Sequence, residues 1–269
     1  MRKVLVPIVR IVLVTILTLV IAVALFEDRF IYYPTREIVR TPRVAYEDVD
    51  FDAVDGTRLH GWFIPAPGRS VLIVSHGNAG NIGHRASMAD FLHEELQVSV
   101  FLYDYRGYGQ SEGVPSEGGT YTDIRGAYAR MQSRGYEARD IFLLGQSLGT
   151  AVSVDLAAEL EVGGVILEAP FTSVAGVARG LFYVPLDWLL RTQYDSLKKI
   201  ARVRAPIAIV HARDDPSVAF DLGSALFDAA PEPKRFFAVD GETHEGATMA
   251  LGLGRLGELK DFVFDRLDR

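Results

Sequence analysis

The five-residue turn GQSLG at residues 145–149 constrains this chain more than any other feature of its sequence. It follows an apolar run at 141–144 and precedes a stretch at 150–160 rich in alanine, valine and leucine. A strand, a sharp G-x-S-x-G turn and a helix in that order place the serine on a strained elbow at the carboxyl edge of a sheet. Glycine suits both ends of the turn, since a side chain there would collide with the neighbouring strand or helix. The motif predicts an elbow that presents the Ser147 hydroxyl; the alternative is a small-residue turn packed under a helix.

Two later segments carry the other groups that a nucleophilic serine requires. Asp214 and Asp215 end the apolar segment APIAIVHARDD, and His244 follows in VDGETHEGA. A serine hydroxyl needs a neighbouring base, and an imidazole can take its proton and return it to a leaving group. A carboxylate then holds the imidazole in the correct tautomer. The sequence therefore predicts Ser147 as nucleophile, His244 as base, and one of the two aspartates as the orienting acid.

The run SVLIVSHGNAGN at residues 70–81 predicts a buried strand that ends beside the elbow. The turn after such a strand commonly offers a backbone N–H to a developing oxyanion, together with the N–H of the residue after the nucleophile. These donors would be the amides of Asn78 and Leu148, with Ala79 as the alternative to Asn78. His76 is better explained as a hydrogen-bonded structural residue, because the sequence has no H-E-x-x-H motif or Cys/His cluster. Neither a metal nor another cofactor is expected.

Several motifs in the same order resemble the membrane-anchored α/β-hydrolase-domain branch of the serine hydrolases. The resemblance spans roughly residues 30–265 and rests on HGNAGNIGHR at 76–85, YDYRGYGQSEGVPSEGGTYTD at 103–123, GQSLG, LEAPFTSV at 167–174 and YDSLKKI at 194–200. It implies an α/β-hydrolase fold and an ester, thioester or peptide substrate.

The same resemblance favours Asp215 as the acid. HARDDPSV follows the family pattern H-G-x-x-D-x-x-V with Asp215 in its fifth position. The sequence departs from the family at Ala212, where glycine is usual, and at Ala219, where proline is common. Both departures lie beside the acid, so Asp214 remains the alternative.

The pattern of apolar runs predicts a mainly parallel sheet covered by helices on both faces. Strands and helical stretches alternate after an initial hairpin, and this alternation is typical of α/β domains. The hairpin joins 46–51 to 58–64 around an Asp-Gly turn. Further strands are expected near 71–75, 98–103, 141–145, 164–168, 206–210 and 235–239, and helices near 84–96, 120–134, 148–160, 218–229 and 248–267.

The amino-terminal segment from Val4 to Phe26 is apolar apart from Arg10 and two threonines. As a helix it would be about 35 Å long, against a bilayer core of about 30 Å. Basic residues precede it and acidic residues follow it, which by the positive-inside rule leaves the amino terminus in the cytoplasm. Residues 1–29 are thus expected to be a single-pass anchor, with the domain on the opposite, periplasmic or extracytoplasmic side. A signal peptide cleaved after Ala22-Val23-Ala24 is the alternative.

Residues 30–269 are expected to form one catalytic domain, a size within the range of a single α/β unit. Residues 171–204 form its longest insertion and hold eight large apolar side chains between Val177 and Leu190. They favour a small lid over the serine, or else a helix packed on the core. The chain has no cysteine, which excludes disulfides and thiolate chemistry.

Charge argues against nucleic acid as a partner. The formal net charge is −7, and three basic residues lie before residue 27, so the remainder is more acidic still. An acidic domain does not attract a phosphate backbone. The expected partners are therefore a small acyl ester or thioester and a membrane.

These observations favour a serine hydrolase that cleaves ester or thioester bonds of lipophilic acyl substrates through an acyl-enzyme on Ser147. A serine peptidase of the same fold is the first alternative. The second is a catalytically silent, membrane-tethered binding protein, since a fold does not dictate a function.

Overall fold

The computed structural model describes residues 26–181, 190–241 and 243–264, together with 6, 7, 10, 11, 14, 15 and 18 of the amino-terminal stretch. Its main feature is an eight-stranded sheet of order β10-β9-β8-β7-β4-β6-β3-β2. The strands are β2 Glu47–Asp52, β3 Arg58–Ile64, β4 Val71–Ser75, β6 Ser99–Tyr103, β7 Ile141–Gln146, β8 Gly164–Glu168, β9 Ile207–Ala212 and β10 Lys234–Val239. Strand β3 pairs antiparallel with both β2 and β6. The other six strands, β6, β4, β7, β8, β9 and β10 in their order across the sheet, pair in parallel with one another.

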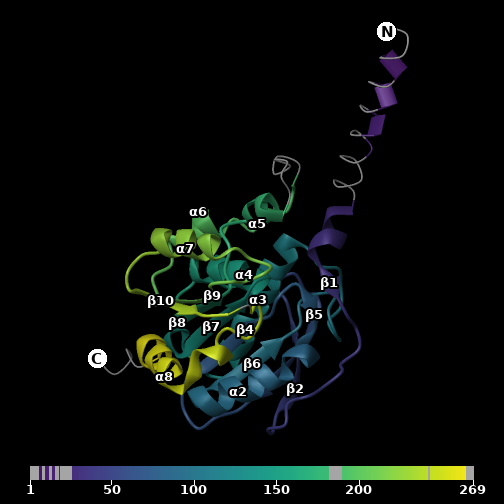
Figure 1. The fold of residues 1–269 in the computed structure, drawn as a ribbon. Helices are drawn as coiled ribbons and strands as arrows, with labels where there is room; N and C mark the ends of the chain where they lie inside the picture. The colour runs from purple at the N-terminus through teal and green to yellow at the C-terminus, as the bar shows by residue number, and fades with distance from the viewer. Residues whose placement is uncertain are drawn as a thin grey trace.

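Helices cover both faces of this sheet (Figure 1). On one face lie α2 Ala86–Leu96 and α8 Gly252–Val263, whose apolar residues share a buried cluster with the sheet. On the other lie α3 Glu117–Ser133, α4 Leu148–Ala157, α6 Ser196–Ile200 and α7 Phe220–Ala229, which share a second cluster. The domain also contains helix α5 Val174–Leu181 and the short helices η1 Ile82–Arg85, η2 Ala138–Asp140 and η4 Met249–Leu251.

The central strands are apolar along their whole length because both of their faces are covered. In β4, Ile73 joins one core cluster while Leu72 joins the other. Strand β7 divides in the same way, with Leu143 in one cluster and Leu144 in the other. Alternate side chains of a strand point to opposite faces, so a strand with two buried faces needs no polar alternation. The predicted α/β fold with a mostly parallel sheet is confirmed.

Several short elements were not predicted. Strand β1 Tyr33–Pro34 pairs in parallel with β5 Ala79–Gly80 in a separate two-stranded sheet. Helix α6 occupies the second half of the long insertion. Elements this short carry too few residues for a periodic signal.

Two sequence-based predictions fall in part on residues outside the described part of the chain. Among the residues described, no helix is long and apolar enough to cross a bilayer; most of the predicted anchor, Val4 to Phe26, lies outside them. Residues 182–189 of the predicted lid also lie outside them. In the described part of the insertion, Val177 packs against a core cluster. The anchor and the lid therefore stay predictions.

Candidate active site

The elbow after β7 has the strained backbone that its sequence predicts. Ser147 has φ +48° and ψ −112°, and its N–H donates to the Glu168 carbonyl over 2.9 Å. A Cβ at Gly145 would lie 2.3 Å from the Gly149 carbonyl oxygen, and one at Gly149 would lie 1.9 Å from the Ser75 carbonyl oxygen. Both distances are far below van der Waals contact. Only glycine fits at these two positions, as predicted, and the serine is left half-buried at the start of α4.

Three predicted side chains come together at the carboxyl edge of the sheet. Ser147 Oγ lies 3.0 Å from His244 Nε2, and His244 Nδ1 lies 2.8 Å and 3.0 Å from the two carboxylate oxygens of Asp215. They follow β7, β10 and β9 respectively, so the parallel sheet brings them to one edge. Because a carboxylate can only accept, the hydrogen of a neutral His244 sits on Nδ1, and Nε2 is free to accept from the serine. Asp214 is exposed and lies outside this hydrogen-bonded chain.

Asp215 is built to stay ionised. Its side chain is fully buried, and burial by itself would raise the pKa of this carboxyl. The ring nitrogens of His211 and His244 oppose that effect, as do the amides of Ser217 and Val218, which donate to Oδ1 over 2.8 Å and 2.9 Å. Together these donors hold the pKa of Asp215 well below its usual range. A permanent negative charge at this place stabilises a protonated imidazole.

Glu168, a residue that sequence reasoning missed, holds the loop that carries His244 through hydrogen bonds. Its buried carboxylate accepts from the Gly246 amide over 2.8 Å and from the Thr248 amide over 3.0 Å. Gln146 Nε2 donates to the same carboxylate over 2.8 Å. A glutamate at the end of an otherwise apolar strand was the signal available in the sequence, within the quoted LEAPFTSV motif.

An ion pair also holds the same loop. Arg85 Nη2 lies 2.5 Å from Glu245 Oε1, and Nη2 also donates to the Ala79 carbonyl over 3.3 Å. The arginine is buried while the glutamate is half exposed. This ion pair links the His244 loop to the turn after β4, and the sequence alone offered no signal for it.

The turn after β4 lies directly against the serine. A Cβ at Gly77 would be 3.7 Å from Ser147 Cβ. The Gly77 carbonyl lies 2.7 Å from His76 Nδ1. Because the C=O and N–H of a trans peptide point in opposite directions, the Asn78 N–H is directed away from the His76 ring. In the described part of the chain, neither this amide nor that of Leu148 donates to a protein acceptor.

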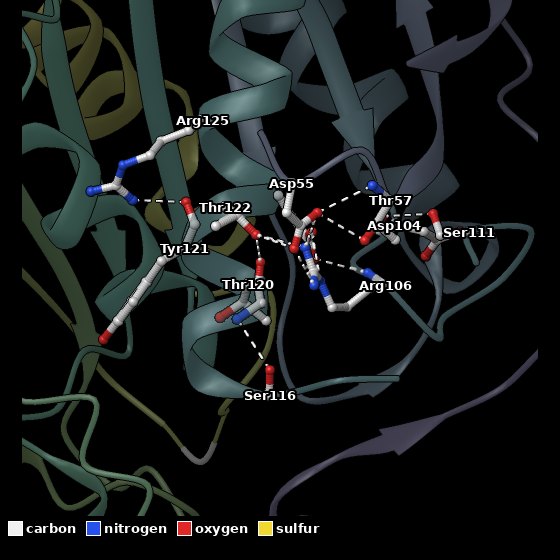
Figure 2. A network of polar contacts seen from close by, with 12 residues as sticks. Asp55, Thr57, Asp104, Arg106, Ser111, Ser116, Thr120, Tyr121, Thr122 and Arg125 are labelled. Carbon is white, nitrogen blue, oxygen red and sulfur yellow. Dashed lines mark hydrogen bonds and ion pairs between the residues drawn. The ribbon is translucent and has the colours of Figure 1, made fainter. Parts of the chain in front are cut away.

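In the loop after β6, Asp104 and Arg106 bond to other parts of the domain. Figure 2 shows the Arg106 guanidinium directed at Asp55, which it contacts over 2.8 Å and 3.1 Å. Arg106 also donates to Asp123 over 2.7 Å and 2.9 Å. Hydrogen bonds from Arg106 and Thr57 hold the pKa of Asp55 below its usual range. Asp104 accepts from the Ile82 amide at the start of η1.

Comparison with known proteins agrees with this architecture. Residues 66–192 match the family model described as "Serine aminopeptidase, S33". An uncharacterised protein of Mycobacterium tuberculosis is 37% identical over 88% of this chain and 87% of its own length. Human α/β-hydrolase domain-containing protein 17B is 35% identical over 73% of this chain and 67% of its own. The structure of the Pyrococcus furiosus esterase Pf2001 superimposes with a TM-score of 0.71 at 20% identity, over 87% of this chain and 98% of the esterase. By its sequence relatives and its fold, this chain belongs to the α/β-hydrolase superfamily.

Proposed function

We propose that the protein is a serine hydrolase that cleaves ester or thioester bonds through an acyl-enzyme on Ser147. One observation carries the proposal: an unbroken hydrogen-bonded chain runs from Ser147 through His244 to an ionised Asp215 at a strained elbow. Esterase structures among the fold neighbours are consistent with it.

In the first half of the reaction, His244 Nε2 takes the hydroxyl proton while Ser147 Oγ bonds to the substrate carbonyl carbon. The protonated imidazole faces Asp215, which stabilises its charge. Collapse of the tetrahedral intermediate breaks the bond to the alcohol or thiol, and His244 returns the proton to that leaving group. In the second half, His244 takes a proton from a water whose oxygen bonds to the acyl carbon. The bond from that carbon to Ser147 Oγ then breaks, His244 returns the proton to Oγ, and a carboxylic acid is released.

The oxyanion of each tetrahedral intermediate would be held by the amides of Asn78 and Leu148. Both amides lie beside the elbow and have no protein acceptor in the described residues. Each such donor is worth on the order of 3 kcal/mol of transition-state stabilisation.

We further propose a lipophilic acyl substrate and attachment to a membrane. The support is the apolar amino-terminal segment, 4–26, and the apolar insertion 171–204, which follows strand β8 in the sequence. The segment would anchor the chain with its amino terminus in the cytoplasm and the hydrolase domain on the opposite side. The insertion would wall the acyl pocket as a lid.

A serine peptidase is the second candidate, because the matching family model is described as an aminopeptidase family. The same three side chains would serve an amide substrate. A catalytically silent binding protein is the third, and it has no need of an intact serine, imidazole and carboxylate in bonding distance.

Labelling with a fluorophosphonate probe tests the proposal. Wild type and Ser153→Ala should react, whereas Ser147→Ala should not. Ser153 is a fair control, since it is a buried serine of the same helix whose hydroxyl has no hydrogen-bond partner among the described residues. A folded wild type that stays unlabelled, in detergent as well as in buffer, would refute the enzyme. Esters and thioesters of increasing acyl length, beside aminoacyl-arylamides, would then separate the hydrolase from the peptidase.

A further inference from the structure

The segment in which the predicted anchor ends and the predicted catalytic domain begins is packed against the candidate active site. Residues 26–31 are helical, β1 follows at Tyr33–Pro34, and the chain continues to residue 37; we call residues 26–37 the strap. Figure 1 shows β1 beside β5. Strand β5 itself continues the turn that contains Asn78.

Three hydrogen bonds fasten the Asn78 residue, and two of them come from the strap. The Tyr33 amide donates to the Asn78 carbonyl over 2.9 Å. The Asn78 side chain reaches back, with Nδ2 donating to the Ile31 carbonyl over 2.8 Å. The third bond is from the Tyr108 hydroxyl to the Asn78 carbonyl, at 2.7 Å. Asn78 is thus held at both its carbonyl and its side chain, while its amide N–H stays free.

The far side of the same turn is fastened to the strap as well. Asn81 Nδ2 lies 3.1 Å from the Thr35 carbonyl and 2.6 Å from the Glu37 carbonyl. The Thr35 amide donates in return to the Gly80 carbonyl over 3.0 Å. Asn81 is fully buried, so these bonds are shielded from water. Both ends of the turn 78–81 are therefore bound to one continuous segment.

The start of the strap is anchored by a buried charge. Glu27 is 2% exposed, and its carboxylate accepts from the Thr192 amide over 2.8 Å and from the Arg191 amide over 3.1 Å. The Tyr32 hydroxyl lies 2.9 Å from that of Tyr194. A buried carboxylate without such partners would cost several kcal/mol, so the strap has one well-defined seat on the domain.

We infer that the strap is a positioning element of the active site, which holds residue Asn78 so that its backbone N–H faces the oxyanion. This inference rests on the proposed function. An oxyanion donor acts only when it is aimed at the place where charge develops. The strap fixes the orientation of Asn78 through its hydrogen bonds to the Asn78 carbonyl and side chain. Asn78 therefore contributes a side chain that positions its own backbone.

A donor of this kind acts on the transition state and not on the bound substrate. Loosening the strap should therefore lower kcat and leave KM unchanged. The affinity for an aryl boronic acid should fall by the same factor, because the tetrahedral boronate adduct on Ser147 places an oxygen where the oxyanion forms. A merely structural strap would instead reduce the number of competent sites and leave the turnover of each one unchanged.

Two variants each remove one hydrogen bond between the strap and Asn78, one by a change at Asn78 and the other by a change in the strap. Asn78→Ala removes the bond to the Ile31 carbonyl but keeps the proposed backbone donor. Tyr33→Pro removes the N–H that reaches the Asn78 carbonyl, and Tyr33→Ala is its matched control, since alanine keeps that N–H. Glu37→Gln is a second control, because the Glu37 side chain is exposed and makes no bond within the described residues.

The assay counts competent sites by fluorophosphonate titration of the full chain and gives kcat per titrated site with a p-nitrophenyl ester. We expect Asn78→Ala and Tyr33→Pro to lose about tenfold or more in kcat, within the roughly 10²–10³-fold worth of a whole donor. Boronate affinity should fall in parallel, while both controls stay at the wild-type value.

The inference would be overturned if Asn78→Ala kept the wild-type kcat per titrated site. It would also be overturned if the only effect of the substitution were a higher KM. Asn78→Ala decides the matter by itself if Tyr33→Pro does not fold. An unlabelled wild type is a different result, because it refutes the proposed hydrolase and not the strap in particular.

Discussion

Replacing Glu168 by glutamine tests how the fold holds the proposed base in place. The carboxylate accepts the Gly246 amide on one oxygen and the Thr248 amide on the other. A glutamine offers a single acceptor oxygen, so its NH₂ group must face one of these two donors. That leaves a buried amide unsatisfied and removes a charge-assisted bond, at a cost of about 2–3 kcal/mol.

This free energy has two measurable consequences. In a chain of this size each 1 kcal/mol lowers Tm by about 2–4 °C, so Glu168→Gln should lose about 4–12 °C. The two amides lie within four residues of His244. The same free energy is therefore the most that the substitution can add to the cost of holding the imidazole in its catalytic position. Since 1.4 kcal/mol is a factor of ten, kcat per competent site should fall by up to about 30- to 150-fold.

The assay combines thermal unfolding with ester turnover normalised by fluorophosphonate titration. Glu161→Gln is the matched control, because it makes the same chemical change at an exposed side chain that forms no bond in the described residues. It should leave both quantities unchanged. A Glu168→Gln protein with lowered Tm but wild-type turnover per site would refute the reasoning, since the carboxylate would then support the fold without positioning His244.

Three further predictions concern the elbow, the acid and the neighbouring loop. Gly149→Ala should destabilise the fold by about 3 kcal/mol or more, because the new Cβ would lie 1.9 Å from a carbonyl oxygen of β4. Gly118→Ala in α3 meets nothing within 4 Å and should instead raise Tm slightly, so equal Tm values would contradict the packing argument. Asp215→Asn should lower kcat by about 10⁴-fold with the fold intact, and a loss below tenfold would argue against its proposed role. Because folding lowers the pKa of Asp215, its ionised form stabilises the protein above the unfolded pKa of about 3.9, and this is lost as pH falls through the folded pKa. The wild-type advantage in stability over Asp215→Asn should therefore shrink on acidification below about pH 4, as urea unfolding would show. Arg106→Lys loses the fork that binds two carboxylates and should cost about 2–3 kcal/mol in urea unfolding with turnover per titrated site unchanged; a large drop in that turnover would give Arg106 more than a structural role.

Much of the fold was predictable because its signals are local. The central strands are buried on both faces and so read as continuous apolar runs, and the strand boundaries lie within one or two residues of those predicted. The elbow was predictable for a similar reason, since its close backbone packing leaves no room for a side chain at positions 145 and 149. The order of serine, acid and histidine then follows from the order of strands that end at one edge.

The supports of the site could not be predicted in the same way. Glu168 meets the Gly246 amide across 78 residues, and Asn78 meets the Ile31 carbonyl across 47. In both bonds one partner is a backbone group, which every residue type carries. The sequence can mark Glu168 as an unusual residue in an apolar strand, but it does not mark the backbone groups to which Glu168 and Asn78 bond.

The acid shows the division most clearly. The amino-acid sequence by itself determined that a carboxylate would follow β9, and the choice between Asp214 and Asp215 depended on a resemblance. The tertiary structure places Asp215 against His244 and leaves Asp214 exposed. Adjacent residues differ in direction once a turn is folded, because the amides of Ser217 and Val218 hold one carboxylate inward and the backbone then points the other outward. Residue types determined which chemistry was available, and three-dimensional packing determined which groups can perform it together.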